Sequence, residues 1–407
     1  MVPEGWIPSQ IGDIAKFSSG GTPSKKNADY WGGDEPWISG KDLKTHYLAS
    51  SIDSLTDEGF KRAKKAPKGS SLILVRGMTL LKDFPVGYAT REVAFNQDLK
   101  ALVPEESVDG LFLSFLLVAE KHKILQLVST AGHGTGRLDT QSIQEYPVNL
   151  PPLSEQKKIA QILSAWDKAI TTTEHLLANS QQQKKALMQQ LLTGKKRLLD
   201  KNGVKFDVEW KSLRLSDFFQ RMTEKNNGKS DNVLTMSGQN GLIRQEDFFK
   251  KTVASETLDG YFLLKKGQFA YNKSYSNGYP MGAIKRLNRY ADGVVTTLYI
   301  CFEISDSDNY ESGYWEHYFE SGLLNKGLSK IAHEGGRAHG LLNVKPSDFF
   351  SLKVAVPCLN EQRKIAAVLF TADQEVASLR QKLDALKLEK RALMQQLLTG
   401  KRRVKVA

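Results

Sequence analysis

The chain has 407 residues and a formal net charge of +12, an excess of Lys and Arg that favours a polyanionic partner. Its length predicts two or three domains with cores of their own, and its 40% hydrophobic and 25% charged residues are typical of globular proteins. It contains no apolar run near the roughly 18 residues of a membrane span, and its first residues lack the features of a signal peptide.

Residues 1–150 are predicted to form an α+β domain. Short β-rich runs such as Ser71–Val75 alternate with glycine-rich turns and with a helical patch at Leu111–Lys121. This mixture of short elements is typical of an α+β fold.

A long helix is predicted within residues 151–200. Pro151 precedes it, Ser154 suits the N-cap, Glu155 suits the first turn, and Gly194 suits the left-handed position after the last turn. The basic cluster Lys195–Arg197 then either complements the helix end or contacts DNA. Apolar residues recur alternately at steps of four and three, which is the heptad pattern of a coiled coil. The predicted seam residues are Ile159, Leu163, Trp166, Ile170, Leu177, Leu187 and Leu191.

Residues 201–356 are predicted to form a second α+β domain. Trp210 has the spacing to its following residues that Trp6 has in the first domain, and Gly293–Ile300 is another β-rich run. Apart from such short similarities the two domains differ.

Residues 357–407 repeat the long helix. The ten residues Ala186–Lys195 recur unchanged at Ala392–Lys401, a shift of 206 (392 − 186). Pro357, Asn360 and Gly400 repeat the helix-end signals, and Lys401–Arg403 repeats the basic cluster. The second set of seam residues is Ile365, Leu369, Val376, Leu383, Leu393 and Leu397. Such self-similarity at a fixed period indicates an internal duplication.

The two sets of seam residues form an apolar stripe along each predicted helix. These stripes are predicted to bury each other within one chain, as an antiparallel coiled coil with a pseudo-two-fold axis. The expected fold class is therefore α+β, with two α+β domains separated by two long helices. A homodimeric coiled coil is the alternative. Lys184 and Lys390 interrupt the stripes at equivalent places, and either extend to solvent or fix the register of the helices.

The segments Pro151–Ala160 and Val356–Ala366, the two Leu-Leu-Thr-Gly-Lys helix ends and Gly20–Ser24 carry a family resemblance. The chain resembles a specificity subunit of a type I restriction-modification enzyme. This resemblance implies two target-recognition domains, 1–150 and 201–356, each reading one half of an asymmetric bipartite site in double-stranded DNA. It implies that the spacer helices, 151–200 and 357–407, set the spacing and dock two methyltransferase subunits, through which restriction/translocase subunits join.

Apolar residues outside the seam are candidates for such docking, or for packing of the domains on the helices: Leu176, Leu192, Leu388 and Leu398.

Motifs for catalysis are absent from the sequence. It contains no P-loop, no His-Glu-x-x-His and no Cys-x-x-Cys, and Gly132–Gly136 departs from the dinucleotide-binding pattern. His333 and His339 lack further metal ligands nearby, and the two cysteines favour a reduced cytoplasmic protein. We expect a non-catalytic subunit without metal or cofactor.

Side chains that hydrogen-bond bases or phosphates on turns are the candidate DNA contacts, since Arg suits guanine and Asn or Gln suits adenine. In the first domain they are Lys25, Lys26, Arg76, Lys82, Gln97, His133 and Arg137. In the second they are Arg221, Lys225, Gln239, Asn240, Asn272, Lys273, Tyr275 and Arg337. The alternative for each is a structural role in its turn.

Two other functions stay open from the sequence. A coiled-coil adaptor with two protein-binding domains explains the heptads but not the positive charge. A self-contained modification enzyme requires a catalytic site that no motif reveals.

Overall fold

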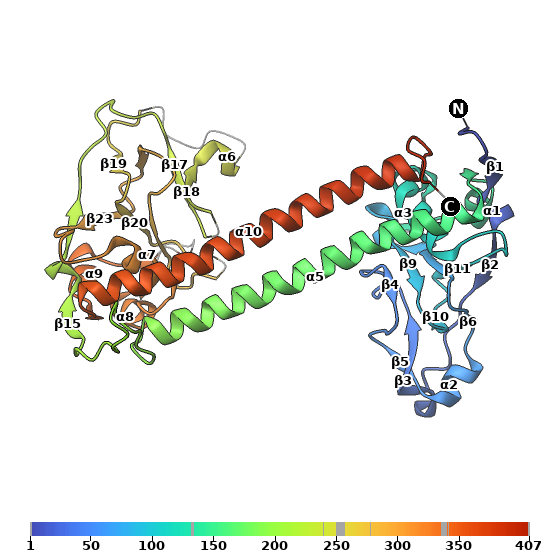
Figure 1. Ribbon diagram of the computed structural model, residues 1–407, viewed down its shortest axis with the longest axis horizontal. Coiled ribbons are helices and arrows are strands. Elements are labelled where there is room, and N and C mark those ends of the chain that lie inside the picture. Colours follow the sequence, from blue (N-terminus) through green and yellow to red (C-terminus); the bar gives the residue numbers. More distant parts are fainter. Residues whose placement is uncertain are drawn as a thin grey trace. The chain divides into compact units, whose positions relative to one another are not determined.

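The computed structural model describes residues 2–131, 134–238, 240–249, 257–276, 278–334, 340 and 342–405. The chain divides into two compact units: unit 1 is Met1–Glu174 with Gln381–Ala407, and unit 2 is His175–Arg380. Each unit combines one globular domain with a part of the long helix α5 (Leu153–Leu191) and a part of the long helix α10 (Leu359–Leu397), drawn green and red in Figure 1. Among the described helices, none is long and apolar enough to cross a membrane.

The first globular domain is built on a five-stranded sheet with the order β2-β11-β7-β9-β4. Helix α3 (Gly110–Ile124) packs on this sheet and extends the predicted helical patch. The Asp109 carboxylate caps the helix by accepting a hydrogen bond from the Phe112 amide at 2.9 Å. The strands are β2 (Ala15–Ser19), β4 (Tyr47–Leu48), β7 (Ser71–Leu74), β9 (Val86–Ala89) and β11 (Leu99–Pro104).

Three smaller sheets complete this domain, with the orders β5-β3-β10-β6, β12-β13-β8 and β1-β14. Their strands are β1 (Ile7–Gln10), β3 (Trp31–Ile38), β5 (Ser54–Leu55), β6 (Lys65–Ala66), β8 (Arg76–Gly77), β10 (Val93–Phe95), β12 (Ser129–Ala131), β13 (Thr135–Arg137) and β14 (Pro147–Leu150). The short helices are α1 (Ile11–Ile14), η1 (Ala28–Tyr30), α2 (Asp57–Arg62), η2 (Met78–Leu81), η3 (Leu125–Leu127) and α4 (Thr140–Gln144).

The second globular domain has a different set of sheets, of which the largest has the order β16-β23-β20-β21. Its core is rich in aromatic rings around Trp315 of α7 (Ser312–Glu320), whose ring centroid lies 4.5 Å from that of Phe218. The strands are β15 (Lys211–Arg214), β16 (Phe219–Met222), β17 (Leu234–Ser237), β18 (Gly241–Arg244), β19 (Phe262–Lys265), β20 (Phe269–Asn272), β21 (Ala283–Arg286), β22 (Asp292–Val295), β23 (Ile300–Ile304), β24 (His333–Glu334), β25 (Leu342–Asn343) and β26 (Lys353–Val356). The other helices are η4 (Leu215–Asp217), α6 (Gln245–Phe249), α8 (Asn325–Ile331) and α9 (Pro346–Phe350).

The β-rich run Gly293–Ile300 is not a single strand, which corrects the simplest interpretation of its sequence. β22 ends at Val295 and β23 begins at Ile300, with a turn in which the Tyr299 amide donates to the Thr296 carbonyl at 3.2 Å. The chain changes sheets at this turn, because β22 pairs with β19 whereas β23 pairs with β16 and β20.

In both units α5 and α10 run antiparallel, which confirms the predicted fold class. In unit 1, Asp167 and Glu174 of α5 pair with Lys390 and Lys387 of α10, so that the partner number falls as the residue number rises. In unit 2, Lys184 of α5 pairs with Asp373 of α10, and Arg197, which follows α5, pairs with Glu361 of α10, so the partner number falls again.

The predicted helix ends are right at the C-terminal side and wrong by two residues at the N-terminal side. Gly194 and Gly400 adopt φ values of 69° and 68°, as expected for the left-handed residue after a helix. The helices begin at Leu153 and Leu359, so Ser154 and Asn360 lie in the first turn and are not N-caps. The reason is that the Pro152 carbonyl already accepts the first helical hydrogen bond, from the Gln156 amide at 3.0 Å.

The predicted seam residues are all buried or half-buried. Those at the helix ends join the cores of the globular domains: Ile159, Leu163 and Leu397 in unit 1, and Leu191, Ile365 and Leu369 in unit 2. Leu383 is also buried, and the remaining positions are half-buried: Trp166, Ile170, Leu177, Leu187, Val376 and Leu393.

The residues outside the seam divide into two pairs. Leu192 and Leu398 are buried in the domain cores, whereas Leu176 and Leu388 are exposed. Domain packing therefore explains the first pair and leaves the second pair free.

Candidate nucleic-acid interface

A buried carboxylate joins the first globular domain to both helices of unit 1. Glu155, in the first turn of α5, is 2% exposed. The Arg403 guanidinium, just after α10, donates two hydrogen bonds to it, each 2.8 Å long, and the Trp6 indole donates a third at 3.2 Å. Three chain segments therefore meet at one charge, which orients the domain on the helix pair.

Unit 2 repeats this joint with the equivalent residues. Glu361, at the start of α10, is fully buried and accepts hydrogen bonds from the Arg197 guanidinium at 2.6 and 2.8 Å and from the Trp210 indole at 3.0 Å. The sequence predicts that the basic clusters after both helices complement the helix ends or contact DNA. Arg197 and Arg403 instead form ion pairs with glutamates, because the antiparallel helix brings a buried glutamate to each of them.

The glutamine that follows each glutamate anchors a second element. The Gln156 side chain accepts a hydrogen bond from the Asp109 amide at 2.8 Å and donates one to the Pro151 carbonyl at 2.8 Å. Asp109 is the N-cap of α3. Gln362 makes the same two bonds, with the Glu311 amide at the start of α7 (2.9 Å) and with the Pro357 carbonyl (2.9 Å). The repeated Pro-to-Glu-Gln segment is thus the attachment point of each domain.

The two seam lysines form ion pairs across the helices. Lys390 pairs with Asp167, which also accepts a hydrogen bond from the Tyr47 hydroxyl at 3.1 Å. Lys184 pairs with Asp373, whose other oxygen lies 3.6 Å from the His317 Nδ1. These contacts favour the register role over simple extension into solvent.

Two arginines of the first domain face each other across neighbouring strands. Arg76 of β8 and Arg137 of β13 are antiparallel register partners, and both are exposed. Directly opposite side chains lie on one face of a sheet with Cβ atoms about 5 Å apart, so their like charges repel. Among the described residues, no carboxylate lies within ion-pairing distance of either guanidinium. Such an uncompensated pair suits an anion or the acceptor atoms of guanine.

A polar hollow of about 340 Å³ in the first domain is lined by two other predicted residues, Lys25 and Gln97. The Lys25 amine lies 5.7 Å from the centroids of the Trp31 and Trp37 rings, and Gln97 accepts a hydrogen bond from the Thr22 hydroxyl at 2.6 Å. Lys26 and Lys82 are exposed elsewhere on the domain.

The second domain also places two of its predicted cations near each other. Arg221 is exposed on β16, and Lys273 is half-buried after β20. Burial, with a contribution from the charge of Arg221, lowers the pKa of the Lys273 amine. Tyr275 lies two residues further along the chain with its ring exposed. Cations that repel each other therefore occur in both domains.

Two other predicted residues of this domain already have internal partners. The Asn272 amide donates to the Tyr299 hydroxyl at 3.2 Å, and its oxygen accepts from the Ser274 amide at 3.0 Å. The Lys225 amine donates to the Gly260 carbonyl at 2.8 Å and lies 4.4 Å from the Phe262 ring centroid. These contacts agree with the alternative interpretation, in which each of these residues has a structural role in its turn.

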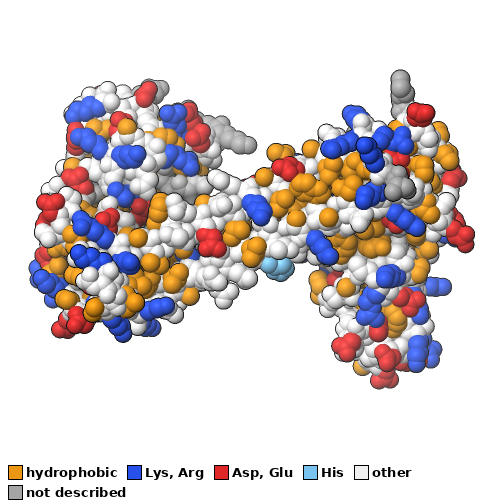
Figure 2. All heavy atoms as spheres, in the orientation of Figure 1, with side chains coloured by type: hydrophobic (Ala, Val, Ile, Leu, Met, Phe, Trp, Pro, Cys, Tyr) orange, Lys and Arg blue, Asp and Glu red, His pale blue; other side chains and the backbone are white. Residues whose placement is uncertain are grey.

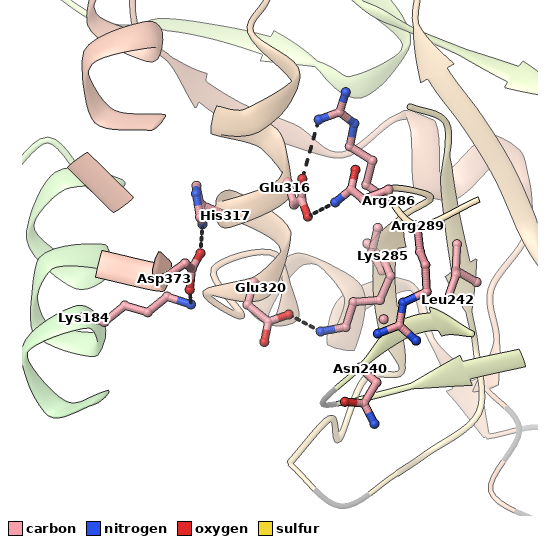
Figure 3. Close-up of a pocket in the computed structure, with 13 residues that line it drawn as sticks. Lys184, Asn240, Leu242, Lys285, Arg286, Arg289, Glu316, His317, Glu320 and Asp373 are labelled. Carbon is pink, nitrogen blue, oxygen red and sulfur yellow. Dashed lines mark hydrogen bonds and ion pairs between the residues drawn. The ribbon is translucent and has the colours of Figure 1, made fainter. Parts of the chain in front are cut away.

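Asn240 lines a charged pocket of about 470 Å³ in unit 2, shown in Figure 3. The cations there face acids: Lys285 pairs with Glu320, and Arg286 lies 3.6 Å from Glu316. Burial is the main cause that raises the pKa of Glu316. Because acids compensate most of its cations, the pocket suits an internal ionic joint between α7 and the neighbouring strands better than a phosphate site.

The remaining three predicted contacts, His133, Gln239 and Arg337, lie outside the described residues. Figure 2 shows one face of the molecule, on which Lys and Arg side chains lie over both globular domains, interspersed with acidic and apolar side chains. The candidate interface therefore consists of local groups of cations.

Comparison with known proteins identifies proteins whose sequences are similar to this chain. Residues 3–179 match the family described as the type I restriction modification DNA specificity domain. The Escherichia coli type I restriction enzyme EcoR124I/EcoR124II specificity subunit is 31% identical over 160 residues, which cover 39% of this chain and 40% of that protein. The match thus spans about two fifths of that relative. The Methanocaldococcus jannaschii MjaVIII specificity subunit is 24% identical, covering 99% of this chain and 94% of that protein.

Solved structures share the fold over the whole chain. The S subunit of a type I restriction-modification system from M. genitalium has a TM-score of 0.60 at 14% identity, covering 98% of this chain and 99% of that one. A chain from a study of complex assembly and conformational transition of the type I R-M system has a TM-score of 0.55 at 18% identity, covering 99% and 100%.

Proposed function

We propose that this chain, which belongs to the specificity subunits of type I restriction-modification systems, reads an asymmetric DNA site made of two separated halves. Each globular domain reads one half. The subunit itself is non-catalytic and needs no cofactor, and the chemistry belongs to two methyltransferase subunits and, through them, to restriction/translocase subunits.

One observation carries the proposal: the same joint holds two unlike domains. The Glu-Arg-Trp and Gln contacts recur in both units, at Glu155 and Gln156 and again at Glu361 and Gln362. The sheets that these joints carry differ in strand number and order. Two different globular domains on the same kind of attachment suit an asymmetric bipartite target, because each half-site needs its own recognition surface.

The local groups of cations support DNA as the partner. Arg76 with Arg137 in the first domain and Arg221 with Lys273 in the second supply positive charge, which phosphates or guanine edges would neutralise. The exposed Leu176 and Leu388 on the helices support docking of the methyltransferase subunits there.

Methylation mapping tests whether each globular domain reads its own half-site. The chain is co-expressed with its neighbouring methyltransferase, and methylated adenines are mapped genome-wide for the wild type, Arg137→Ala and Arg221→Ala. Each variant is expected to relax one half of the motif and leave the other intact, with a loss of about 1–3 kcal/mol of base discrimination. An equal loss at both halves would instead indicate phosphate contacts, and salt-insensitive DNA binding would favour a protein adaptor.

A helix-length series tests the spacer role. Residues are added or deleted in equal numbers in the Thr173–Lys184 part of α5 and in the facing part of α10. The unspecified gap of the methylated motif is expected to change while the bases read stay the same. Variants that fold and methylate with an unchanged gap would contradict a role of helix length in spacing.

A further inference from the structure

Two exposed apolar side chains lie beside the arginine pair of the first globular domain. Met78 is 75% exposed and Leu81 is 44% exposed, and both belong to η2, the short helix that directly follows β8. The sequence offers no motif for them, since an isolated Met or Leu is most often a core residue. Their position comes from the tertiary structure alone.

The backbone under these side chains is held in place. Leu80, between them, is buried in the domain core together with Phe84. The amides of Lys82 and Asp83 both donate to the Thr79 carbonyl at 2.9 Å. A Cβ at Gly136 of β13 would lie 2.8 Å from the Leu80 Cβ, so glycine is required for this close approach. Met78 and Leu81 therefore project from a fixed support.

The charges around η2 favour DNA as the occupant of this apolar surface. Arg76 and Arg137 lie on the strands next to it, and Lys82 ends the helix. Asp83, the nearest acid along the chain, is paired with Lys121 at 3.0 Å. An apolar protein partner would leave three cations uncompensated. The major groove of DNA offers both features together, because it presents guanine acceptors beside the apolar 5-methyl group of thymine.

We propose that Met78 packs on the 5-methyl group of a thymine in the half-site that the first globular domain reads, with Leu81 at its side. This inference rests on the proposed function and adds to it an apolar specificity contact next to the arginine pair. The flexible, polarizable thioether of methionine suits such a small apolar target.

The test uses the complete complex of this chain with its methyltransferase subunits and duplexes that carry the mapped site. Each thymine of the first half-site is replaced in turn by deoxyuridine, which lacks only the methyl group, and Kd is measured by fluorescence anisotropy. One replacement is expected to weaken wild-type binding about fourfold, the effect of one buried methyl group. Met78→Ala is expected to bind the two duplexes equally. Because Met78 is exposed, the thermal unfolding midpoint of the Met78→Ala variant should equal that of the wild type.

Ile52→Ala is the matched control, since Ile52 is another exposed apolar residue of the same domain. This variant should keep the full sensitivity to deoxyuridine. Wild-type indifference to every deoxyuridine, a half-site without any thymine, or retained sensitivity in Met78→Ala would each overturn the inference. So would a Met78→Ala variant that loses only its methyltransferase subunits, which would make η2 a protein-docking surface. If the wild-type complex binds no specific site at all, the proposed function itself fails.

Discussion

The joints between domains and helices are alike in the two units, whereas the domains themselves are not. Glu155 and Glu361 accept hydrogen bonds from the same residue types, and Gln156 and Gln362 bind the start of α3 and of α7, respectively. Above these joints, one domain has a five-stranded main sheet and the other a four-stranded sheet with an aromatic core. The attachment is therefore constrained by a buried charge, whereas the sheets that it carries differ.

The comparison also reveals small differences between the equivalent ion pairs. The side chain of Arg197 is 17% exposed and that of Arg403 is 43% exposed, although both pair with a buried glutamate. Asp167 lies next to Tyr47, whereas Asp373 lies next to His317. Energetic differences between the units should follow these differences in burial, and the following predictions rely on them.

The largest effect is expected from Glu361→Gln, which leaves Arg197 with an uncompensated charge at a buried site. The free energy of unfolding should fall by about 3 kcal/mol. Glu155→Gln should cost less, because water already reaches Arg403. Urea unfolding followed by tryptophan fluorescence measures both. Glu174→Gln, in an exposed pair with Lys387, is the control and should change stability by less than about 0.5 kcal/mol. Equal losses at Glu174 and Glu361 would contradict the role assigned to the joint.

The next effect is a pH dependence that is expected to be stronger in unit 1 than in unit 2. Burial lowers the pKa of His46 to about 4, with opposing effects from Asp167, which raises it, and Lys390, which lowers it. In the unfolded chain the His46 imidazole becomes protonated near pH 6.5, whereas in the folded chain it stays neutral down to about pH 4. The free energy of unfolding therefore falls as the pH falls from about 6.5 to 4. The loss is about 3 kcal/mol at most.

His46→Gln should flatten the stability curve over this interval. In unit 2, burial also lowers the pKa of His317, but two carboxylates, Asp373 and Glu320, oppose this lowering, whereas one, Asp167, does so at His46. His317→Gln should therefore flatten the curve less. Urea unfolding at pH 7, 6, 5 and 4 measures both variants. Parallel curves for His46→Gln and the wild type would show that this histidine is not the titrating group.

A smaller effect is expected from the seam lysines. Lys390→Met should cost about 1 kcal/mol and Lys184→Met less, since Asp167 is better buried than Asp373. Double-mutant cycles with Asp167→Asn and Asp373→Asn separate each ion pair from the packing of its lysine stem. A larger coupling in the Lys184 pair than in the Lys390 pair would contradict the burial argument.

Much of the architecture follows from the sequence because it is encoded locally. The heptad stripe, the glycines after each helix and the repeat at a shift of 206 residues predict two long helices, and their duplication predicts antiparallel pairing. The helix starts were misplaced by two residues, because the choice of first hydrogen-bond acceptor at Pro152 is not visible in residue preferences. The resemblance carried by the Pro-to-Glu-Gln segments agrees with the family whose model matches residues 3–179.

The candidate interface depended on the tertiary structure. The sequence predicts Arg76 and Arg137 as two separate DNA contacts. They are 61 positions apart (137 − 76) and become neighbours only because β8 pairs with β13. The partners of Glu155 and Glu361 were missed for the same reason, although the Glu and Arg positions repeat at one shift and could have been matched.

The two long helices and the two unlike α+β domains can be predicted from the order of the residues, since periodic burial and helix ends are properties of neighbouring residues. The tertiary structure selects which arginines join buried glutamates and which, among the described residues, have no carboxylate partner. It also decided that Met78 stays in solvent beside two of them. Strand pairing and helix pairing bring together groups that no local pattern relates.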